Sequence, residues 1–308
     1  MAKHGYVISQ INVSVRNRPN ARRPLGDITG QGAGLIELIE KQLHNCGSTV
    51  FQDDRTERAH RIEGYERNGW VLALEGIAGP YGVIGKAVNL DSGDERRFNA
   101  RTANMNPLRA MFMIPEQGYD GLLFCERVGN AILRPFLDKI ILREIGRDLG
   151  VTINNRSYID VEAWQRFLDD ASVQKITAVY RSTRAEDFGS QRGRSQDLKM
   201  VVGGPVARRL GNRLTDVITS VTASNVPVAY NIEDYPELLP QSPHYAHDHL
   251  ELQVSDSSEQ RTIVIERSEL PQFTYVLGSR RPRTPQLHEL WQTHGAKILS
   301  DLGATIEQ

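Results

Sequence analysis

The sequence contains few cysteines and no long hydrophobic run, and both absences exclude classes of protein. Cys46 and Cys125 are the only 2 cysteines among 308 residues, too few for a disulfide framework or for a metal site with four thiolates. No apolar stretch approaches the roughly 18 residues that a membrane-spanning helix needs. The first residues, MAKHGYVISQINVSV, lack the apolar run and cleavage site of a signal peptide. We therefore expect a cytoplasmic protein that would reach a membrane only through a partner.

The common motifs of catalysis and cofactor binding are also missing. Neither a G-x-S-x-G elbow nor a supported Cys–His pair is present. The run Gly79–Lys86 is not a P-loop, because its glycines are one residue too far apart and Ala87 replaces the Ser or Thr that would hold magnesium. The run GQGAG at residues 30–34 offers amides to a phosphate, but Leu35 breaks the dinucleotide-binding spacing, and a flexible helix entry explains it. We predict a non-enzymatic protein without metal or cofactor.

What is present is an ordinary globular composition with segregated charge. Apolar residues make up 39% and charged residues 24% of the chain, and the formal net charge is −1. This length allows one to three domains. Residues 181–213 hold eight basic residues against three acids, whereas residues 225–260 hold seven acids and no Lys or Arg. This asymmetry, which the net charge hides, favours a surface that binds an anion.

The basic segment ends in a predicted strand and helix, DLKMVVGGPVARRLGNRLTDVITSV (Asp197–Val221). Leu198–Val202 is a short apolar run typical of a strand, and Pro205 suits the first helical position. Five apolar residues then fall on one core-facing stripe at 100° per residue: Val206, Leu210, Leu214, Val217 and Val221. Outside the stripe lie Arg208, Arg209, Asn212 and Arg213. They form either a solvated helix face or a surface that binds phosphate.

The N-terminal part of the chain holds a second group of arginines. Residues 5–15 (GYVISQINVSV) alternate as a half-buried strand does. From Asn17 to Gly34 there is no apolar periodicity, so we expect a mobile loop or one that a ligand orders. A helix is expected at Leu35–Leu43. The loop and the residue before it bring four guanidiniums close together: Arg16, Arg18, Arg22 and Arg23.

The remaining pattern predicts an α+β fold built mainly on antiparallel sheet. Short apolar runs separated by turns fill residues 49–114, and Asn68-Gly69 is a strong hairpin signal. A strand is expected at Gly121–Val128, and a helix at Ile132–Leu149 that stops at Gly150. A compact β-α-β-β-α order then follows, and further strands and a last helix occupy residues 250–302. We expect a globular domain of residues 1–154 and 225–308, with a smaller α+β domain, residues 155–224, inserted into it.

Three arginine groups separated along the chain would form one phosphate-binding groove if folding brought them together. The planar guanidinium suits phosphate oxygens, and contacts of this kind hold nucleic acid without reading its sequence. The candidate DNA-binding residues are Arg16, Arg18, Arg22, Arg23, Arg181, Arg184, Arg192, Arg194, Lys199, Arg208, Arg209, Arg213, Arg280, Arg281 and Arg283. An alternative is a protein-interaction module whose arginines only increase its solubility.

A second alternative is a metal-dependent nuclease or phosphohydrolase. The run HYAHDH supplies His244, His247 and His249, together with Asp248. Its spacing matches neither H-E-x-x-H nor the H-x-H-x-D-H order of binuclear zinc hydrolases, and nearby prolines argue against a helix that would align the ligands. We interpret the run as a polar loop beside a strand that begins at Leu250.

Two other sets of residues have simpler structural interpretations. Asp53 and Asp54, with two nearby glutamates, imitate the carboxylates of a nuclease but fit one acidic surface turn. Tyr119 and Phe124, like other aromatics, fall in apolar runs, so we interpret them as core residues rather than as platforms for base stacking.

The stretch Asp197–Val221 resembles the strand and basic helix of the RexA family, cytoplasmic components of the Rex phage-exclusion systems of temperate phages. The order of elements is similar too: an early strand at Gly5-Tyr6, the strand GLLFCE at Gly121–Glu126, and β-α-β at Tyr158–Tyr180. The resemblance implies a homodimer, with a globular and a mobile swivel domain, that closes on double-stranded DNA without sequence preference. It also implies a RexB-like membrane ion-channel partner and a role in prophage-encoded antiviral defence.

The acidic segment suggests one further hypothesis. Residues 233–259 would cover the basic face while DNA is absent, and would leave it easily, because screened ion pairs at the surface are weak. Reversing the charges of Glu233 and Asp234 should then tighten DNA binding.

Overall fold

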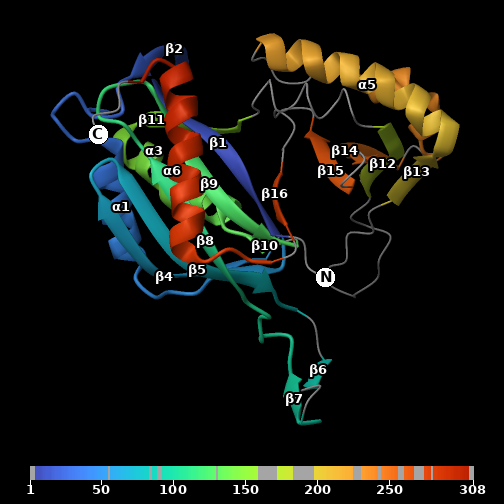
Figure 1. The fold of residues 1–308 in the computed structure, drawn as a ribbon, viewed down its shortest axis with the longest axis horizontal. Helices are drawn as coiled ribbons and strands as arrows, with labels where there is room; N and C mark the ends of the chain where they lie inside the picture. The colour runs from blue at the N-terminus through green and yellow to red at the C-terminus, as the bar shows by residue number, and fades with distance from the viewer. Residues whose placement is uncertain are drawn as a thin grey trace. The chain divides into compact units, whose positions relative to one another are not determined.

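The computed structural model describes residues 4–54, 56–82, 85–88, 92–129, 131–158, 172–182, 198–224, 230–241, 244–255, 260–266, 274–278 and 280–304. The chain divides into two compact units, Met1–Asn155 with Tyr275–Gln308 (unit 1) and Arg156–Thr274 (unit 2). The predicted α+β class with antiparallel sheets is confirmed (Figure 1). Among the described residues, no helix combines the length and the apolar character that a membrane crossing requires.

Unit 1 is built on a large sheet whose strands follow the order β11-β1-β9-β8-β5-β4-β3. These strands are β1 (His4–Val15), β3 (Phe51–Asp53), β4 (Arg58–Asn68), β5 (Val71–Pro80), β8 (Asn106–Met113), β9 (Asp120–Val128) and β11 (Val151–Ser157). Three further strands pair beside this path: β2 (Arg18–Arg23) and β16 (Tyr275–Gly278) with β1, and β10 (Ala131–Ile132) with β9. A separate hairpin of β6 (Gly85–Val88) and β7 (Glu95–Phe98) stands at the end of the extension from β5 and β8 (Figure 1).

Helices cover both faces of this sheet, so the predicted strand at residues 5–15 is present as β1 but is buried on both faces instead of half-buried. Val7, Ile11 and Val13 are buried in the cluster that includes the apolar faces of α1 (Leu35–Cys46) and of the continuous helical stretch α2 (Arg134–Phe136), η1 (Leu137–Leu142) and α3 (Arg143–Leu149). Tyr6 projects to the other face, where its ring lies 6.0 Å from that of Trp291 in α6 (Thr284–Asp301). Figure 1 shows α6 crossing the sheet on this side.

Two predicted turns of unit 1 are formed by glycines with positive φ. Gly69 adopts φ +58 in the hairpin where Asn68 pairs with Val71, so the hairpin signal is confirmed. The helical stretch ends at Gly150, which adopts the left-handed conformation with φ +66. Glycine takes this conformation readily because it lacks a Cβ atom. The π-helical segment η1 within this stretch was not foreseen from the apolar spacing.

Unit 2 is a four-stranded sheet in the order β13-β12-β14-β15, covered by helix α5 (Gly204–Ser224). Its strands are β12 (Ser172–Ser182), β13 (Leu198–Gly203), β14 (Tyr245–Ser255) and β15 (Gln260–Glu266). Helix α5 buries Ala207, Leu210 and Leu214, whereas Val206 is 38% exposed, so the predicted stripe is wrong at its first residue. A Cβ atom on Gly211 would lie 2.4 Å from Val173, which shows how closely the helix approaches β12.

The inserted unit is larger than the sequence predicted. Its first boundary, between Asn155 and Arg156, agrees within one residue, but it continues to Thr274 instead of ending at residue 224. The reason is that β14 pairs with β12 from Ser172–Ser255 to Ser182–Tyr245, so a strand that follows the helix completes the sheet. The first helix of the predicted β-α-β-β-α order and most of residues 181–196 lie outside the described residues.

Candidate nucleic-acid interface

The N-terminal arginines lie on a β-hairpin, which corrects the prediction of a mobile loop. Strand β2 pairs with β1 through Val13–Arg23, Ser14–Arg22 and Val15–Arg18. The two-residue turn contains Asn17 with φ +61, a conformation that asparagine tolerates better than most residues. The sequence RPNARR does not alternate in hydrophobicity because this short edge strand is largely exposed. Its backbone pairing needs no apolar side chains.

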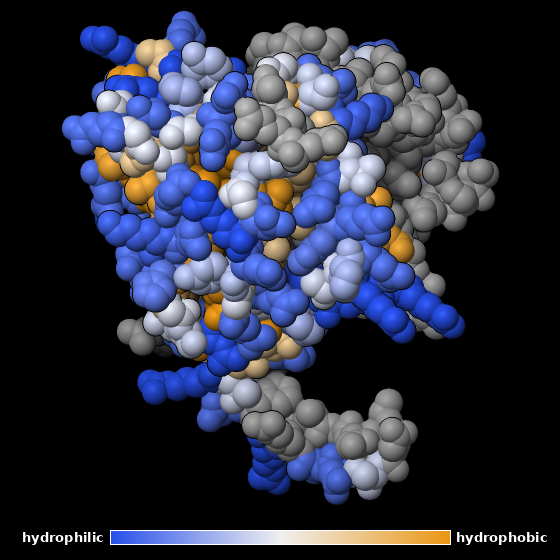
Figure 2. Space-filling view, turned by 60° about the vertical axis from the view of Figure 1, so that its left-hand side comes forward, coloured by the Kyte–Doolittle hydropathy of each residue, from blue (hydrophilic) through white to orange (hydrophobic). Residues whose placement is uncertain are grey.

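This arginine hairpin (Val15–Arg23) concentrates positive charge without compensating acid. Its sequence contains four arginines and no Asp or Glu. Arg16 and Arg18 are exposed and Arg23 is half-buried, and the side chains of these three make no hydrogen bond or ion pair with any described residue. Figure 2 shows that the described residues on the viewed face are mostly hydrophilic, with hydrophobic residues in small separate spots. The hairpin therefore offers three guanidiniums to an external anion.

The fourth arginine of the hairpin is fixed. Arg22 donates to the carboxylate of Asp120 (2.5 Å) and to the carbonyl of Tyr119 (2.8 Å), and the amide of Gln10 donates to the same carboxylate (2.7 Å). The guanidinium carbon lies 5.6 Å from the centroid of the Tyr119 ring. Tyr119 is 50% exposed, so its interpretation as a core residue is wrong, whereas Phe124 is buried as predicted.

The glycine-rich loop after the hairpin already contains its own anion. The carboxylate of Asp27 accepts hydrogen bonds from the backbone amides of Gly30 (2.7 Å), Gln31 (3.0 Å) and Gly32 (2.9 Å). The bond from Gly32, with those from the other two amides, holds the pKa of Asp27 below its usual value. These amides are thus occupied, and an external phosphate would have to displace Asp27 to reach them.

Helix α5 carries the basic residues of unit 2 on its exposed side. Arg208, Arg209, Asn212 and Arg213 are exposed, which agrees with their predicted position outside the core-facing stripe. Arg208 makes no ion pair with any described residue. On the neighbouring strand β13, the Lys199 ammonium lies 4.0 Å from Glu251.

An acidic segment lies beside this helix within the same unit. It consists of the short 3-10 turns η2 (Ile232–Asp234) and η3 (Pro236–Leu238). Arg209 donates to Glu237 (2.7 Å), and the guanidinium of Arg213 lies 5.3 Å from the centroid of the Tyr235 ring. The hypothesis that acids cover the basic helix thus has a structural counterpart, although the pairing acid is Glu237 and not Glu233 or Asp234.

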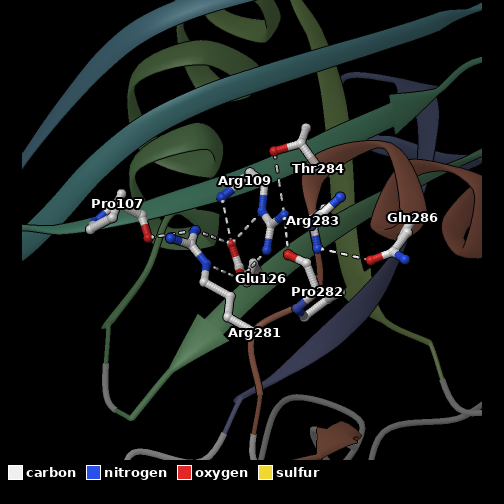
Figure 3. Close-up of polar contacts among 8 residues, drawn as sticks. All are labelled: Pro107, Arg109, Glu126, Arg281, Pro282, Arg283, Thr284 and Gln286. Atoms are coloured by element: carbon white, nitrogen blue, oxygen red, sulfur yellow. Dashed lines mark hydrogen bonds and ion pairs between the residues drawn. The ribbon is translucent and has the colours of Figure 1, made fainter.

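Of the C-terminal arginines, one belongs to a buried ion triad (Figure 3). Glu126 on β9 is fully buried, and Arg109 on β8 donates to it through Nη2 (2.6 Å) and Nε (2.9 Å). Arg281 donates to the same carboxylate (2.8 and 2.7 Å) and to the carbonyl of Pro107 (2.9 Å). Arg109 also donates to the carbonyl of Pro282 (2.9 Å). The triad therefore fastens the segment that leads into α6 to the sheet.

The triad determines the protonation of its carboxyl group. Burial raises the pKa of Glu126, but the hydrogen bonds and charges of Arg109 and Arg281 outweigh burial and bring the pKa below its usual value. The backbone N–H of Arg283 donates to the Gln286 side chain (3.2 Å) at the start of α6. Arg280 is exposed and makes no ion pair with any described residue. Arg281 is thus committed to the fold, whereas the Arg280 side chain remains available.

The histidines do not form a common site. The predicted loop is the start of strand β14, where His247 pairs with Tyr180 and His249 pairs with the preceding residue, Val179. The register of the two strands shifts here through a β-bulge, so the two histidines lie opposite neighbouring residues of β12 although they are two residues apart on β14. Neighbouring positions of a strand face opposite sides of the sheet, and so, therefore, do the two histidines. The His247 ring lies against the buried Tyr180 (5.3 Å between centroids), whereas His249 lies 2.8 Å from Asp248. Among the described residues, no group of three His, Cys, Asp or Glu is placed to hold a metal ion.

Four predicted site residues are not placed by these contacts. Arg184, Arg192 and Arg194 lie outside the described residues, and for Arg181 only the backbone, in β12, is described. The described arginine hairpin belongs to unit 1, and the basic face of α5 belongs to unit 2. No protein-family model, curated protein or solved structure matches the chain.

Proposed function

We propose that the protein binds nucleic acid through its phosphates, without sequence preference and without catalysis, and that double-stranded DNA is its target. The observation that carries the proposal is the arginine hairpin, whose residues Arg16, Arg18 and Arg23 have no counterion among the described residues. Guanidiniums bind phosphate oxygens through a planar pair of donors and stay charged at any physiological pH.

The geometry favours a positioning role over sequence readout. Contacts to phosphate fix a protein on nucleic acid but carry no sequence information. Apart from its arginines, the hairpin has only two polar side chains that could contact a base, Asn17 and Asn20, and it contains no Asp or Glu. In unit 2, Arg208 and its neighbours on α5 present a second basic surface that supports the same target.

The biological setting that we propose follows from the resemblance to RexA. In that setting the protein is a homodimer in a prophage-encoded phage-exclusion system, acts in the cytoplasm, closes on DNA and triggers a RexB-like membrane ion channel. The metal-dependent nuclease is not favoured, because His247 and His249 face opposite sides of β14.

The proposal is tested by electrophoretic shift at low salt on two duplexes of equal length and unrelated sequence. We expect equal affinity for both, binding that falls steeply as salt rises, and no cleavage with added magnesium, manganese or zinc. The variant Arg16→Glu/Arg18→Glu should lose binding. The matched variant Lys41→Glu/Arg101→Glu, which changes two exposed residues of unit 1, should keep most of it. Absence of binding at low salt, or cleavage that needs His247, would contradict the proposal.

A further inference from the structure

Tyr119 is held in place by its backbone while its ring is left in solvent. It lies in the loop between β8 and β9, directly after Gly118, whose φ of +146 suits glycine. The carbonyl of Gly118 accepts a hydrogen bond from the Leu25 amide (2.9 Å), and the carbonyl of Tyr119 accepts one from Arg22 (2.8 Å). The ring is half-exposed, and its hydroxyl has no hydrogen-bond partner among the described residues.

The arginine beside this ring is equally well fixed. Arg22 uses one terminal nitrogen, Nη2, for both Asp120 and the Tyr119 carbonyl. Asp120 is itself nearly buried, with a side chain 10% exposed, and is held by Gln10. A planar cation and an aromatic ring are thus presented together, 5.6 Å apart, by hydrogen-bonded backbone. Such a pair loses little conformational entropy when a flat ligand packs against it.

The surroundings of the ring point to a nucleobase rather than to a protein partner. Protein interfaces surround an aromatic anchor with further apolar surface. Here the other exposed large hydrophobic residues of the described chain are Val50, Leu149, Val201, Val206 and Leu290. None of them belongs to the arginine hairpin or to the loop that carries Tyr119. An isolated aromatic ring beside unpaired guanidiniums matches a ligand with both a flat base and phosphates.

We infer that Tyr119 and Arg22 form a stacking site for one unpaired nucleobase, with phosphates of the same strand bound by Arg16, Arg18 and Arg23. This inference rests on the phosphate binding of the proposed function and adds nucleic acid with unpaired bases to the duplex as a target. Bases within a duplex are stacked on their neighbours and expose no face, so the site selects a single strand, a frayed end or a junction. The hairpin then binds the phosphates of any nucleic acid, while the ring favours those with unpaired bases.

The test measures fluorescence anisotropy with a labelled 12-mer oligothymidylate, the same backbone with abasic sites, and a 12-base-pair duplex. Tyr119→Ala should weaken binding of the oligothymidylate by about 5- to 100-fold, in line with the usual effect of removing a stacking ring. Tyr119→Phe should bind within about twofold of wild type, because stacking does not need the hydroxyl. Neither variant should change binding of the abasic strand, and Leu290→Ala serves as the control for loss of an exposed side chain.

The outcomes separate this inference from the proposed function. If Tyr119→Ala binds oligothymidylate as well as wild type while Arg16→Glu/Arg18→Glu does not, phosphate binding stands and the stacking site is wrong. If wild type binds neither the oligothymidylate nor the duplex, both fail. Since Tyr119 is half-exposed, its variants should retain the wild-type melting temperature, which circular dichroism verifies.

Discussion

Arg209 of helix α5 donates a 2.7 Å hydrogen bond to Glu237, a residue of the acidic segment beside that helix. Their side chains are 68% and 32% exposed, and pairs of this kind contribute about 0.2–1 kcal/mol in the folded state. A phosphate that binds Arg209 would therefore replace Glu237 at little cost. If the helix binds phosphate, Glu237 is a weak competitor for it.

Removing this competitor should tighten DNA binding. We predict that Glu237→Gln raises the affinity for duplex DNA by up to about fivefold at low salt, the equivalent of the energy of one exposed ion pair. The gain should vanish at high salt, where both interactions are screened. Glu289→Gln, which neutralises an exposed acid on α6, is the control for the change in net charge. Weaker binding by Glu237→Gln would show that Glu237 supports the interface instead of competing for it.

The buried triad predicts a large effect on stability and little effect on binding. Glu126→Gln leaves Arg109 buried without its counterion, and breaking a buried pair in this way costs about 3–5 kcal/mol. Arg281→Gln should cost less, because Arg109 still pairs with Glu126. Urea denaturation measures both effects. At a temperature where all proteins are folded, Arg281→Gln should bind duplex DNA with the salt dependence of wild type, and a reduced dependence would mean that Arg281 contacts phosphate.

The same carboxylate gives a pH dependence with a defined sign. The pKa of Glu126 is lower in the folded protein than its usual value of 4.5. The stability that the charged carboxylate contributes is therefore present above about pH 4.5 and is lost as the pH falls through the folded pKa. Between pH 6 and pH 3, Glu126→Gln should lose less additional stability than wild type. An equal loss in both proteins would place the acid sensitivity elsewhere.

Asp27 should control the order of the loop whose backbone amides donate hydrogen bonds to its carboxylate. In Asp27→Ala the amides of Gly30, Gln31 and Gly32 lose their acceptor, so their hydrogen exchange should become faster than in wild type. The exchange of the same amides in wild type should also rise as the pH falls below the lowered pKa of Asp27, once exchange is corrected for intrinsic pH dependence. Asp54→Ala, which removes another exposed carboxylate, should leave these amides unchanged. Unaltered exchange in Asp27→Ala would show that the turn is held by its backbone alone.

Residues with strong local preferences made much of the fold predictable. The strand at residues 5–15, the Asn68-Gly69 turn and the stop at Gly150 each reflect a local rule, and each is found in the structure, although the strand is buried on both faces. The end of the inserted unit was not predictable in this way. It depends on the long-range pairing of β14 with β12, and β14 begins with polar residues that do not resemble a strand.

The candidate site was predicted in part. The exposure of Arg208 and its neighbours follows from helical periodicity, but the hairpin was not foreseen because an exposed edge strand leaves no hydrophobic pattern. Two other features do leave a signal in the sequence. Glu126 and Arg109 are opposite charges inside strands that are otherwise apolar, and such charges are rarely buried unless they are paired. Tyr119 precedes its apolar strand and so lies outside the buried face.

The most direct test of the account is the salt dependence of duplex binding by the arginine hairpin. The logarithm of the binding constant falls with the logarithm of salt concentration with a slope of about −0.9 for each phosphate contact. We predict that Arg16→Gln/Arg18→Gln makes this slope shallower by about 1.8, while the exposed pair Lys41→Gln/Arg101→Gln leaves it unchanged. Equal slopes for wild type and the hairpin variant would show that the arginine hairpin does not bind phosphate, and would contradict the central claim.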